Sequence, residues 1–583
     1  MTQAAQTWPA ATIEETRATL SAPGMPFEME TVEVRGIPTR VYKQAVPHLR
    51  AIFDMTTQWG EREFLVYEGD RLTYGAFHRA ASALGQIFVE RFGVARGDRV
   101  AVIMRNYPEW PLAFWAAAAI GAVVVPINAW GTGPDLEYAL ADSGARVVVV
   151  DGERLERLIP HLGNLDLAAV VAVRTPRNLL GPALALDDLI GPLASWASLP
   201  EGNLPDPNLH PDDDATILYT SGTTGKPKGA LGTHRNVMSN LISITFGAMR
   251  ALVRRGEALP VADPAAPQRT NLLPVPFFHV TGCHSMMIPT MATGTRLILM
   301  HKWNAEHALE LVERERINGF VGVPSMVWQV IESPDFATRD ISSLDSIGYG
   351  GAAAAPELTR KVRELFPSVW PGQGYGLTET SSVSTANSAE DYLARPESVG
   401  IAVPVCDLRV VDAEGRNVAT GEIGELLIKG PNVIKAYWNK PDATAKAIVD
   451  GWFHSGDIVR MDEDGFVYLL DRAKDMVIRG GENIYSVEIE DVLFAHPAVV
   501  DAAIVGIPHR VLGEEVGAVV QVKPGIPVSE AELRSHVAQR LASFKVPVRI
   551  DIRTVELPKN ANGKTLKNIL REEIQALAPA NGG

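Results

Sequence analysis

The sequence predicts an α/β protein, and its strand-like runs and its length support that prediction. Short apolar runs such as RVAVIM (99–104) and RVVVV (146–150) alternate with segments of helix length. This alternation is typical of a largely parallel sheet covered by helices. The chain has 583 residues, which is too long for one compact core. We therefore expect a large N-terminal domain of α/β sheets and at least one further domain.

The most apolar stretch, WPLAFWAAAAIGAVVVPI (110–127), contains no charge over its eighteen residues. Pro111, Gly121 and Pro126 interrupt it, and its second half is rich in valine. A buried helix followed by a buried strand therefore fits better than a membrane span. The polar segment DLEYALADSG (135–144) predicts the next helix.

Beyond about residue 400 the pattern changes to short strands separated by Gly and Asp turns, as in GELLIKG (424–430) and GWFHSGDIVRMDEDGFVYLLDR (451–472). These runs predict a β-rich subdomain. The units of helix, strand and turn that follow predict a small α+β domain. We place the two domains at residues 1–471 and 472–583.

Composition limits the partners that the chain can have. The net charge of −15 and the absence of long Lys/Arg runs argue against nucleic acid or an anionic membrane. Cys283 and Cys406 stand far apart without metal-ligand spacing, so neither a disulfide framework nor a zinc site is predicted. The N-terminus lacks a basic segment followed by an apolar one, and we expect a cytoplasmic protein without an integral membrane segment. The oligomeric state is left open, a homodimer included.

A glycine-rich segment, YTSGTTGKPKG (219–229), directly follows the strand-like run ATIL (215–218). Its glycines free backbone N–H groups, while its hydroxyls, Lys226 and Lys228 add donors and positive charge. This composition suits a phosphate cradle, although a solvated turn has the same composition. A Walker A loop needs four residues between its glycines and Ser or Thr after the lysine, whereas Pro227 follows Lys226 here. The segment therefore predicts a phosphate site of another kind.

Six further motifs follow this segment along the chain. They are PVPFFHVTG (274–282), GYGGAA (348–353), GYGLTET (374–380), WFHSGD (452–457), DRAKDMVIRGGENIYSVEIE (471–490) and PKNANGKTLK (558–567). In this order the chain resembles the adenylate-forming superfamily, in its branch of acyl-CoA synthetases and fatty-acid–CoA ligases, from about residue 50 to 572. The resemblance implies that a carboxylate attacks ATP to give acyl-AMP and pyrophosphate, and that the thiol of coenzyme A then displaces AMP. It also implies a mobile C-terminal domain.

When an anionic carboxylate attacks the anionic phosphates of ATP, positive charge and N–H donors are needed around those phosphates. We expect the β- and γ-phosphates to be held by Thr220, Ser221, Gly222, Thr223, Thr224, Gly225 and Lys228. The resemblance implies that Lys564 bridges the carboxylate and the α-phosphate. Thr378 is expected to bind the α-phosphate, and Glu379 to hold Mg²⁺ through a carboxylate oxygen.

The resemblance also assigns the nucleoside and the hinge. It implies that Tyr375 stacks on adenine beneath a thin wall made by Gly351, Ala352 and Ala353. Asp457 and Arg472 are then expected to bind the ribose. Lys474 falls at the hinge of the small domain, and Gly480 and Gly481 fit a narrow channel for a pantetheine arm.

The segments expected to line the acyl site are FFHVTGC (277–283), GVPSMVW (322–328) and GYGGA (348–352), and they contain no Arg or Lys. A dicarboxylate is therefore disfavoured, because its far charge would be buried without a partner. Apolar walls are expected from Phe278, Val280, Met326 and Trp328. We predict an apolar monocarboxylic acid, which is fatty, arylalkanoic or alicyclic, with His279 either a gate beside its carboxylate or a core residue.

Other functions on the same fold each require particular residues. An amino-acid adenylation domain needs an acidic residue for the substrate ammonium, and none occurs between Phe277 and Ser285. A fatty acyl-AMP ligase that loads a carrier protein stays open. A non-catalytic nucleotide-binding protein would leave Lys564 and Glu379 unexplained. The sequence thus predicts an acid–thiol ligase with ATP, Mg²⁺ and coenzyme A, acting in fatty acid metabolism.

Overall fold

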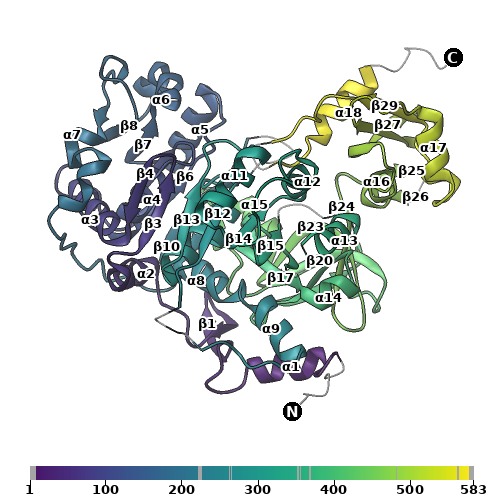
Figure 1. The fold of residues 1–583 in the computed structure, drawn as a ribbon, viewed down its shortest axis with the longest axis horizontal. Coiled ribbons are helices and arrows are strands. Elements are labelled where there is room, and N and C mark those ends of the chain that lie inside the picture. The colour runs from purple at the N-terminus through teal and green to yellow at the C-terminus, as the bar shows by residue number, and fades with distance from the viewer. Residues whose placement is uncertain are drawn as a thin grey trace.

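The structure is a computed structural model that describes residues 8–220, 226–261, 263, 266–350, 354, 356–366, 369–480, 482–560 and 563–576. The ribbon shows a large body, coloured from purple to green, and a smaller C-terminal lobe in yellow (Figure 1). The large body contains an N-terminal hairpin of β1 (Met29–Val34) and β2 (Ile37–Tyr42) and two larger sheets. The lobe has a sheet of its own.

The first of the larger sheets contains the alternating strands that the sequence predicted. In spatial order its strands are β21 (Ala436–Tyr437), β11 (Lys228–Thr233), β10 (Asp214–Thr220), β6 (Val123–Pro126), β5 (Arg99–Ile103), β7 (Val147–Asp151), β8 (Ala169–Val173) and β9 (Leu184–Ala185). Strands β6 to β9 are parallel to β5, whereas β10 and β11 pair antiparallel. Strand β10 ends at Thr220 and β11 begins at its register partner Lys228, so these two described residues of the glycine-rich segment lie at one end of this sheet.

Helices precede or follow these strands in the chain and cover the sheet. Helix α3 (Tyr74–Glu90) precedes β5, and the helices between the strands are α4 (Glu109–Ala119), α5 (Gly133–Ser143), α6 (Gly152–Leu158) and α7 (Leu186–Ile190). Further helices of the large body are α1 (Ile13–Leu20), α2 (Leu49–Met55), α8 (His234–Ser243), α9 (Phe246–Arg254), α10 (Ile288–Thr293), α11 (Ala305–Glu315), α12 (Pro324–Glu332), α13 (Pro356–Leu365), α14 (Ala389–Ala394) and α15 (Pro441–Ala447). The sequence prediction of an α/β domain is confirmed.

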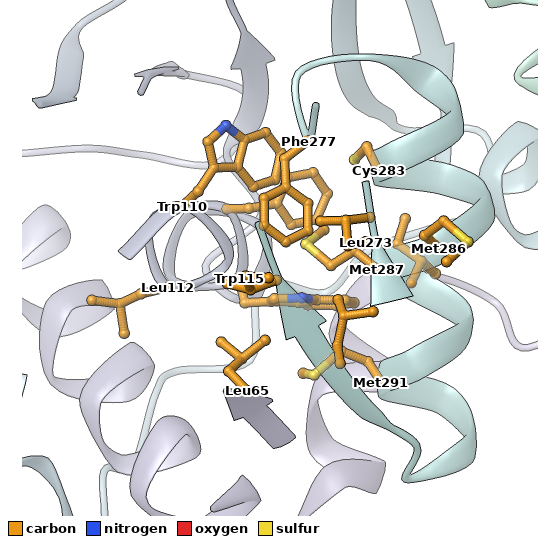
Figure 2. Close-up of a cluster of buried hydrophobic side chains, with 14 of the residues drawn as sticks. Leu65, Trp110, Leu112, Trp115, Leu273, Phe277, Cys283, Met286, Met287 and Met291 are labelled. Atoms are coloured by element: carbon orange, nitrogen blue, oxygen red, sulfur yellow. The ribbon is translucent and has the colours of Figure 1, made fainter. Parts of the chain in front are cut away.

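Helix α4 is buried along its whole length, which explains the uncharged stretch that contains it. It packs on β5 and β6, while Trp110 stacks on Phe277 from the other sheet with ring centroids 4.9 Å apart. Trp110 and Trp115 face a cluster of methionines that includes Met287 (Figure 2). The helix is enclosed between two layers, so the predicted buried helix and buried strand are confirmed. No helix in the described part of the chain has the length and apolar character of a membrane span.

The second large sheet combines parallel strands with antiparallel ones. Its order is β19 (Asp407–Val411), β20 (Ile423–Lys429), β23 (Trp452–Met461), β24 (Val467–Arg472), β18 (Ser398–Ala402), β17 (Ser382–Ser388), β16 (Trp370–Leu377), β15 (Ser346–Tyr349), β14 (Gly319–Gly322), β12 (Thr270–Leu273), β13 (Arg296–Leu299), β3 (Glu63–Tyr67) and β4 (Asp70–Thr73), and β22 (Ile448–Val449) pairs with β23. Strands β16 to β3 pair in parallel. The β-rich subdomain predicted beyond residue 400 is therefore continuous with the α/β sheet through β17 and β18.

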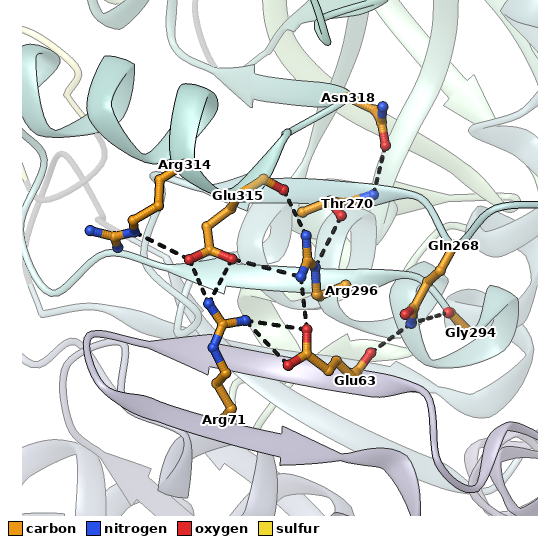
Figure 3. A network of polar contacts seen from close by, with 9 residues as sticks. All are labelled: Glu63, Arg71, Gln268, Thr270, Gly294, Arg296, Arg314, Glu315 and Asn318. Atoms are coloured by element: carbon orange, nitrogen blue, oxygen red, sulfur yellow. Dashed lines mark hydrogen bonds and ion pairs between the residues drawn. The ribbon is translucent and has the colours of Figure 1, made fainter.

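A network of charges fixes the edge strands β3 and β4 to this sheet (Figure 3). Nη2 of Arg71 lies 2.8 Å from Oε1 of Glu315 at the end of α11, and Nη1 of Arg296 lies 2.7 Å from Oε2 of Glu63. The side chain of Glu315 is buried, so its charge depends on these partners. The network joins segments that are more than two hundred residues apart in the chain.

The C-terminal lobe has a sheet with strands β26 (Glu482–Ile484), β25 (Val477–Arg479), β28 (Gly513–Val522), β27 (Val499–His509) and β29 (Arg549–Arg553). Helices α16 (Ser486–Phe494), α17 (Glu530–Ala538) and α18 (Lys567–Ala576) pack on it. Its two hydrophobic clusters are built from residues after Val477. The α+β prediction is confirmed, and the boundary between residues 471 and 472 stays a prediction.

Candidate active site

A cavity of about 990 Å³ lies where the carboxyl ends of strands from both large sheets meet the C-terminal lobe. Nine of the predicted site residues line it: Thr220, Lys228, His279, Tyr375, Thr378, Glu379, Arg472, Lys474 and Lys564. They come from segments more than three hundred residues apart, so the fold brings together what the separate motifs predicted. Ser221 to Gly225, Gly351 to Ala353 and Gly481 lie outside the described residues.

Lys228 begins β11 at the end of the glycine-rich segment, and its Nζ lies 5.0 Å from the ring centroid of Tyr437. The hydroxyl of Tyr437 donates to Oε1 of Glu379 at 2.8 Å. A cation, a phenol and a carboxylate are thus contiguous at this end of the cavity. Tyr437 reaches this place because β21 pairs with β11, and no motif in the sequence indicated it.

Burial raises the pKa of Glu379, and the opposing influences are the hydrogen bond from Tyr437 and the positive charges of Arg472 and Lys228. A cation close to this carboxylate would stabilise its charged form and would offset the free-energy cost of its burial. Carboxylate oxygen is also the ligand that Mg²⁺ prefers. Glu379 therefore fits as a residue that would hold a divalent cation, which would supply positive charge beside the phosphates.

The turn that carries Thr378 and Glu379 has strained backbone on its C-terminal side. Thr378 begins a short 3₁₀ turn, η6 (Thr378–Thr380), and Ser382 just beyond it has φ of +102°. A non-glycine residue in that region costs free energy, so the surroundings must hold it. The hydroxyls of Ser382 and Ser285 lie 2.5 Å apart, and a Cβ at Gly376 would lie 1.5 Å from the Ser382 carbonyl. Only glycine fits at Gly376, and the turn is fixed from both sides.

The residues predicted to bind the nucleoside contact one another. The hydroxyl of Tyr375 donates to Oδ2 of Asp457 at 2.6 Å, and Nε of Arg472 lies 3.1 Å from Oδ1 of the same carboxylate. Asp457 and Arg472 are register partners on β23 and β24. Oδ1 of Asp457 is buried and has no hydrogen bond among the described residues. Apart from its ion pair with Arg472 this oxygen is available for a ribose hydroxyl, although Asp457 itself is not among the lining residues.

Lys564 reaches the cavity from the C-terminal lobe on a tight turn. Its backbone N–H donates to Oδ1 of Asn560 at 3.0 Å, and the Asn560 N–H donates back to the Lys564 carbonyl at 2.9 Å. Gly563 has φ of +75°, and a Cβ there would lie 2.9 Å from Cγ2 of Val323 in the cavity wall. The turn therefore packs directly against the large body.

The ammonium group of Lys564 is largely buried and lies near other cationic side chains. Burial, and then the charges of Arg472 and Lys474, lower the pKa of Lys564 to about 8. Burial also lowers the pKa of Lys474. The described Gly480 is not among the lining residues, and its N–H donates to the Leu512 carbonyl at 2.7 Å. The lobe thus presents its Lys564 face to the cavity.

His279 lines the cavity beside Phe278 and Val280, as the sequence predicted. Burial lowers the pKa of His279 to about 4, so its imidazole is neutral at pH 7. Its Nδ1 accepts the Thr281 N–H at 3.4 Å. A neutral ring with its other nitrogen free to donate suits a carboxylate, and the gate remains a prediction.

The prediction that Met326 and Trp328 wall the acyl site is wrong. Among the described residues neither lines the cavity, because α12 directs both side chains elsewhere. Met326 lies against Gly322, where a Cβ would be 3.2 Å from its Sδ, and Trp328 packs against the main core. Helix α9 supplies the wall instead, with Gly247, Ala248, Ala251 and Leu252. The small residues of α9, spaced by one helical turn, were the signal that could have indicated it.

Besides the predicted lysines and Arg472, a further cationic side chain lines the cavity, from a segment not expected there. Arg255 follows α9, and its Nη1 lies 3.1 Å from Oε2 of Glu390 while its Nε lies 2.9 Å from Oε1 of Glu257. Two carboxylates therefore already neutralise its charge. The sequence argument against a dicarboxylic substrate assumed that no cation lines the acyl site, so with Arg255 there the exclusion stays a prediction, now supported by the pairing of that cation.

Comparison with known proteins supports this picture. The family model of the AMP-binding enzyme matches residues 53–438, and that of the AMP-binding enzyme C-terminal domain matches residues 488–564. A feruloyl-CoA synthase of Amycolatopsis sp. is 35% identical over 506 residues, covering 87% of this chain and 94% of that protein. The long-chain-fatty-acid–CoA ligase FadD13 of Mycobacterium tuberculosis is 35% identical over 509 residues, with the same coverage.

Solved structures are similar over almost the whole chain. The anthranilate CoA ligase AuaEII in complex with anthranoyl-AMP superposes with a TM-score of 0.80 at 26% identity, covering 91% of this chain and 98% of that one. ATP-bound MatB from Rhodopseudomonas palustris superposes with a TM-score of 0.77 at 28% identity, covering 91% and 99%. The fold and the cavity therefore define an adenylate-forming enzyme. The chain belongs to the AMP-binding enzyme family, as an AMP-forming acyl-CoA ligase.

Proposed function

We propose that the enzyme activates an apolar monocarboxylic acid, which is fatty, arylalkanoic or alicyclic, first to acyl-AMP and then to acyl-CoA. The observation that carries this proposal is the composition of the cavity. One end gathers Lys228, Arg472 and Lys564, and the other runs as an apolar arm between α9 and strands β15 and β16. Charged phosphates and an apolar acid would thus meet in one cavity.

The acyl arm is lined by small and apolar groups. Its floor lacks side chains at Gly348, Gly350, Gly372 and Gly374, and register pairs Gly348 with Gly372. Helix α9 covers it, and Phe278, Val280 and Val323 close its sides. Burying an apolar chain here stabilises the complex by about 0.8 kcal/mol for each CH₂. The aromatic and long-chain acids in the names of the relatives fit such an arm.

For the first half-reaction, we assign charge stabilisation to residues that already face the cavity. Lys564 would lie between the carboxylate and the α-phosphate, with Lys228 and the glycine-rich segment on the β- and γ-phosphates and Thr378 on the α-phosphate. Glu379 would hold Mg²⁺, which supplies positive charge to the phosphates when bound. His279, neutral and half-buried, would orient the acid by donating a hydrogen bond.

For the second half-reaction, residues 472–583 would rotate as a unit about Lys474. The Lys564 turn now packs against Val323 in the cavity wall, and in this proposal it leaves that place when the thiol enters. The same rotation would bring Gly480 and Gly481 towards the cavity, where their lack of side chains leaves space for a pantetheine arm. Coenzyme A is the acceptor in this proposal.

The test is incubation with ATP, Mg²⁺, coenzyme A and a panel of acids, following pyrophosphate and thioester separately. Octanoate and phenylalkanoates should give both products with a higher kcat/KM than acetate or succinate. Pyrophosphate without thioester would point to a carrier-protein acceptor. Absence of pyrophosphate with every acid would contradict the proposal.

A further inference from the structure

The acyl arm extends along the full length of two parallel strands. Ser346 of β15 is paired with Trp370 of β16, and both line the cavity at the end far from Tyr375 and the nucleotide site. Side chains two residues apart share a face of a strand, so Trp370 belongs to the same face as Gly372 and Gly374. The part of the floor that has no side chains therefore begins at Gly350 and Gly374 and ends at the indole of Trp370.

The indole of Trp370 is held between two guanidinium groups. Cζ of Arg255 lies 5.2 Å from its ring centroid, and Cζ of Arg363 lies 4.6 Å from it. Arg255 is in turn paired with Glu390. Cation–π contacts on an aromatic ring favour one ring position, and the ion pair fixes one of the two cations. The far end of the arm is thus bulky, charged and held in place, whereas its floor has no side chains.

We infer that Trp370, held between Arg255 and Arg363, is the stop of the acyl arm and sets the longest acid that the enzyme accepts; this inference rests on the proposed function. Ser346 and Gly350 are four residue steps apart along the strand, a length of about 13 Å. An extended alkyl chain with C–C bonds of ~1.5 Å covers that length with roughly ten carbons. A longer chain meets the indole and the Arg255–Glu390 pair, where it must desolvate charges or bend.

The experiment compares kcat/KM for two series of acids: straight-chain acids from butanoate to hexadecanoate, and ω-phenylalkanoates from phenylacetate to phenyloctanoate. The wild type should decline steeply beyond the length of roughly ten carbons. Trp370→Ala removes the stop, so the ratio of kcat/KM for hexadecanoate over octanoate should rise by roughly tenfold or more, since each further methylene that is buried is worth about fourfold and two of them already exceed tenfold. Trp328→Ala is the matched control, because Trp328 is a partly buried tryptophan outside the cavity lining.

A second variant tests the same arm by blocking it. A Cβ at Gly372 has its nearest contacts at 3.5 Å, so Gly372→Val adds bulk to the floor without a clash at Cβ. It should lower kcat/KM for decanoate much more than for butanoate, which keeps the inference testable if Trp370→Ala does not fold.

Two results would overturn the inference: an unchanged ranking of chain lengths in Trp370→Ala, or an equal shift in Trp328→Ala. Both of these results can be observed only if the wild-type enzyme converts acids to thioesters. Failure of the proposed function would instead appear as absence of thioester with every acid in the wild type.

Discussion

Replacing Lys564 by alanine should separate the two half-reactions and leave the fold intact. The pKa of Lys564 is about 8 instead of its ordinary 10.5, so keeping this lysine charged in the ligand-free cavity costs roughly 3 kcal/mol at pH 7. The folded state binds fewer protons than the unfolded one between pH 8 and 10.5, and stability from this group therefore rises with pH through that window. Removing the lysine at pH 7 should not lower the melting temperature.

Activity should respond in the opposite way. Loss of one preorganised donor at developing charge costs about a hundredfold to a thousandfold in rate. Lys564→Ala should therefore reduce pyrophosphate release with acid and ATP by at least that much, while supplied acyl-AMP still reacts with coenzyme A. For the wild type, kcat/KM for ATP should fall above pH 8, as about one tenth of the lysines keep their proton at pH 9.

Lys545→Ala is the matched control, since Lys545 lies in the same lobe, pairs with Glu488 and is not among the cavity-lining residues. It should leave pyrophosphate release close to that of the wild type. An equal loss of both half-reactions in Lys564→Ala would refute the assignment to a single step. A large fall in its melting temperature would refute the cost assigned to the buried charge.

Three further predictions concern the hinge, the cation site and the charge network. Lys474→Pro should leave pyrophosphate release normal and slow thioester formation, because proline restricts the backbone rotation of the hinge; an unaltered thioester step would place the hinge elsewhere. Tyr437→Phe removes the hydrogen bond to Glu379 and should lower adenylation about tenfold, with an altered dependence on Mg²⁺ concentration as the readout. Glu315→Ala should lower the free energy of unfolding by about 2 kcal/mol without changing the ranking of acids, because it leaves Arg71 and Arg296 without a buried partner.

The predicted site residues that line the cavity stand within contiguous motifs. Lys228, Thr378 and Lys564 each lie in a short segment rich in glycine or polar residues, and such segments form turns at strand ends. Thr378 follows the carboxyl end of β16 and Lys228 pairs with Thr220 at the end of β10, so local patterns indicated one edge for these two. Lys564 meets them from the C-terminal lobe, and its place was predicted from the resemblance of its motif and not from the local pattern. The α/β class could also be predicted from a local pattern. A parallel strand that is buried on both faces leaves a continuous apolar run in the sequence, and these runs alternate with segments of helix length.

The residues that the sequence did not indicate depend on pairing between distant segments. Tyr437 reaches Glu379 only because β21 pairs with β11, and Arg255 lines the cavity because α9 crosses the second sheet. The error at Trp328 has the same origin. A helix offers several faces, and packing of α12 on the core rather than its own sequence decided which face meets the cavity. Burial of an apolar residue is predictable from one sequence, but the cavity or core that it faces is not.

The arrangement of α9 separates acid recognition from nucleotide chemistry. On one side Arg250 and Arg254 are buried and lie 3.2 and 3.0 Å from the carboxylate oxygens of Asp391, so removing either partner would leave a buried charge at high cost. This fixes the helix over the sheet. Its other side meets the acyl arm through Gly247, Ala248 and Ala251. Substitutions on that side can reshape the arm while the ion pairs hold the helix, and none of them touches Lys228, Glu379 or Lys564, so the acid can change while the adenylation chemistry stays the same.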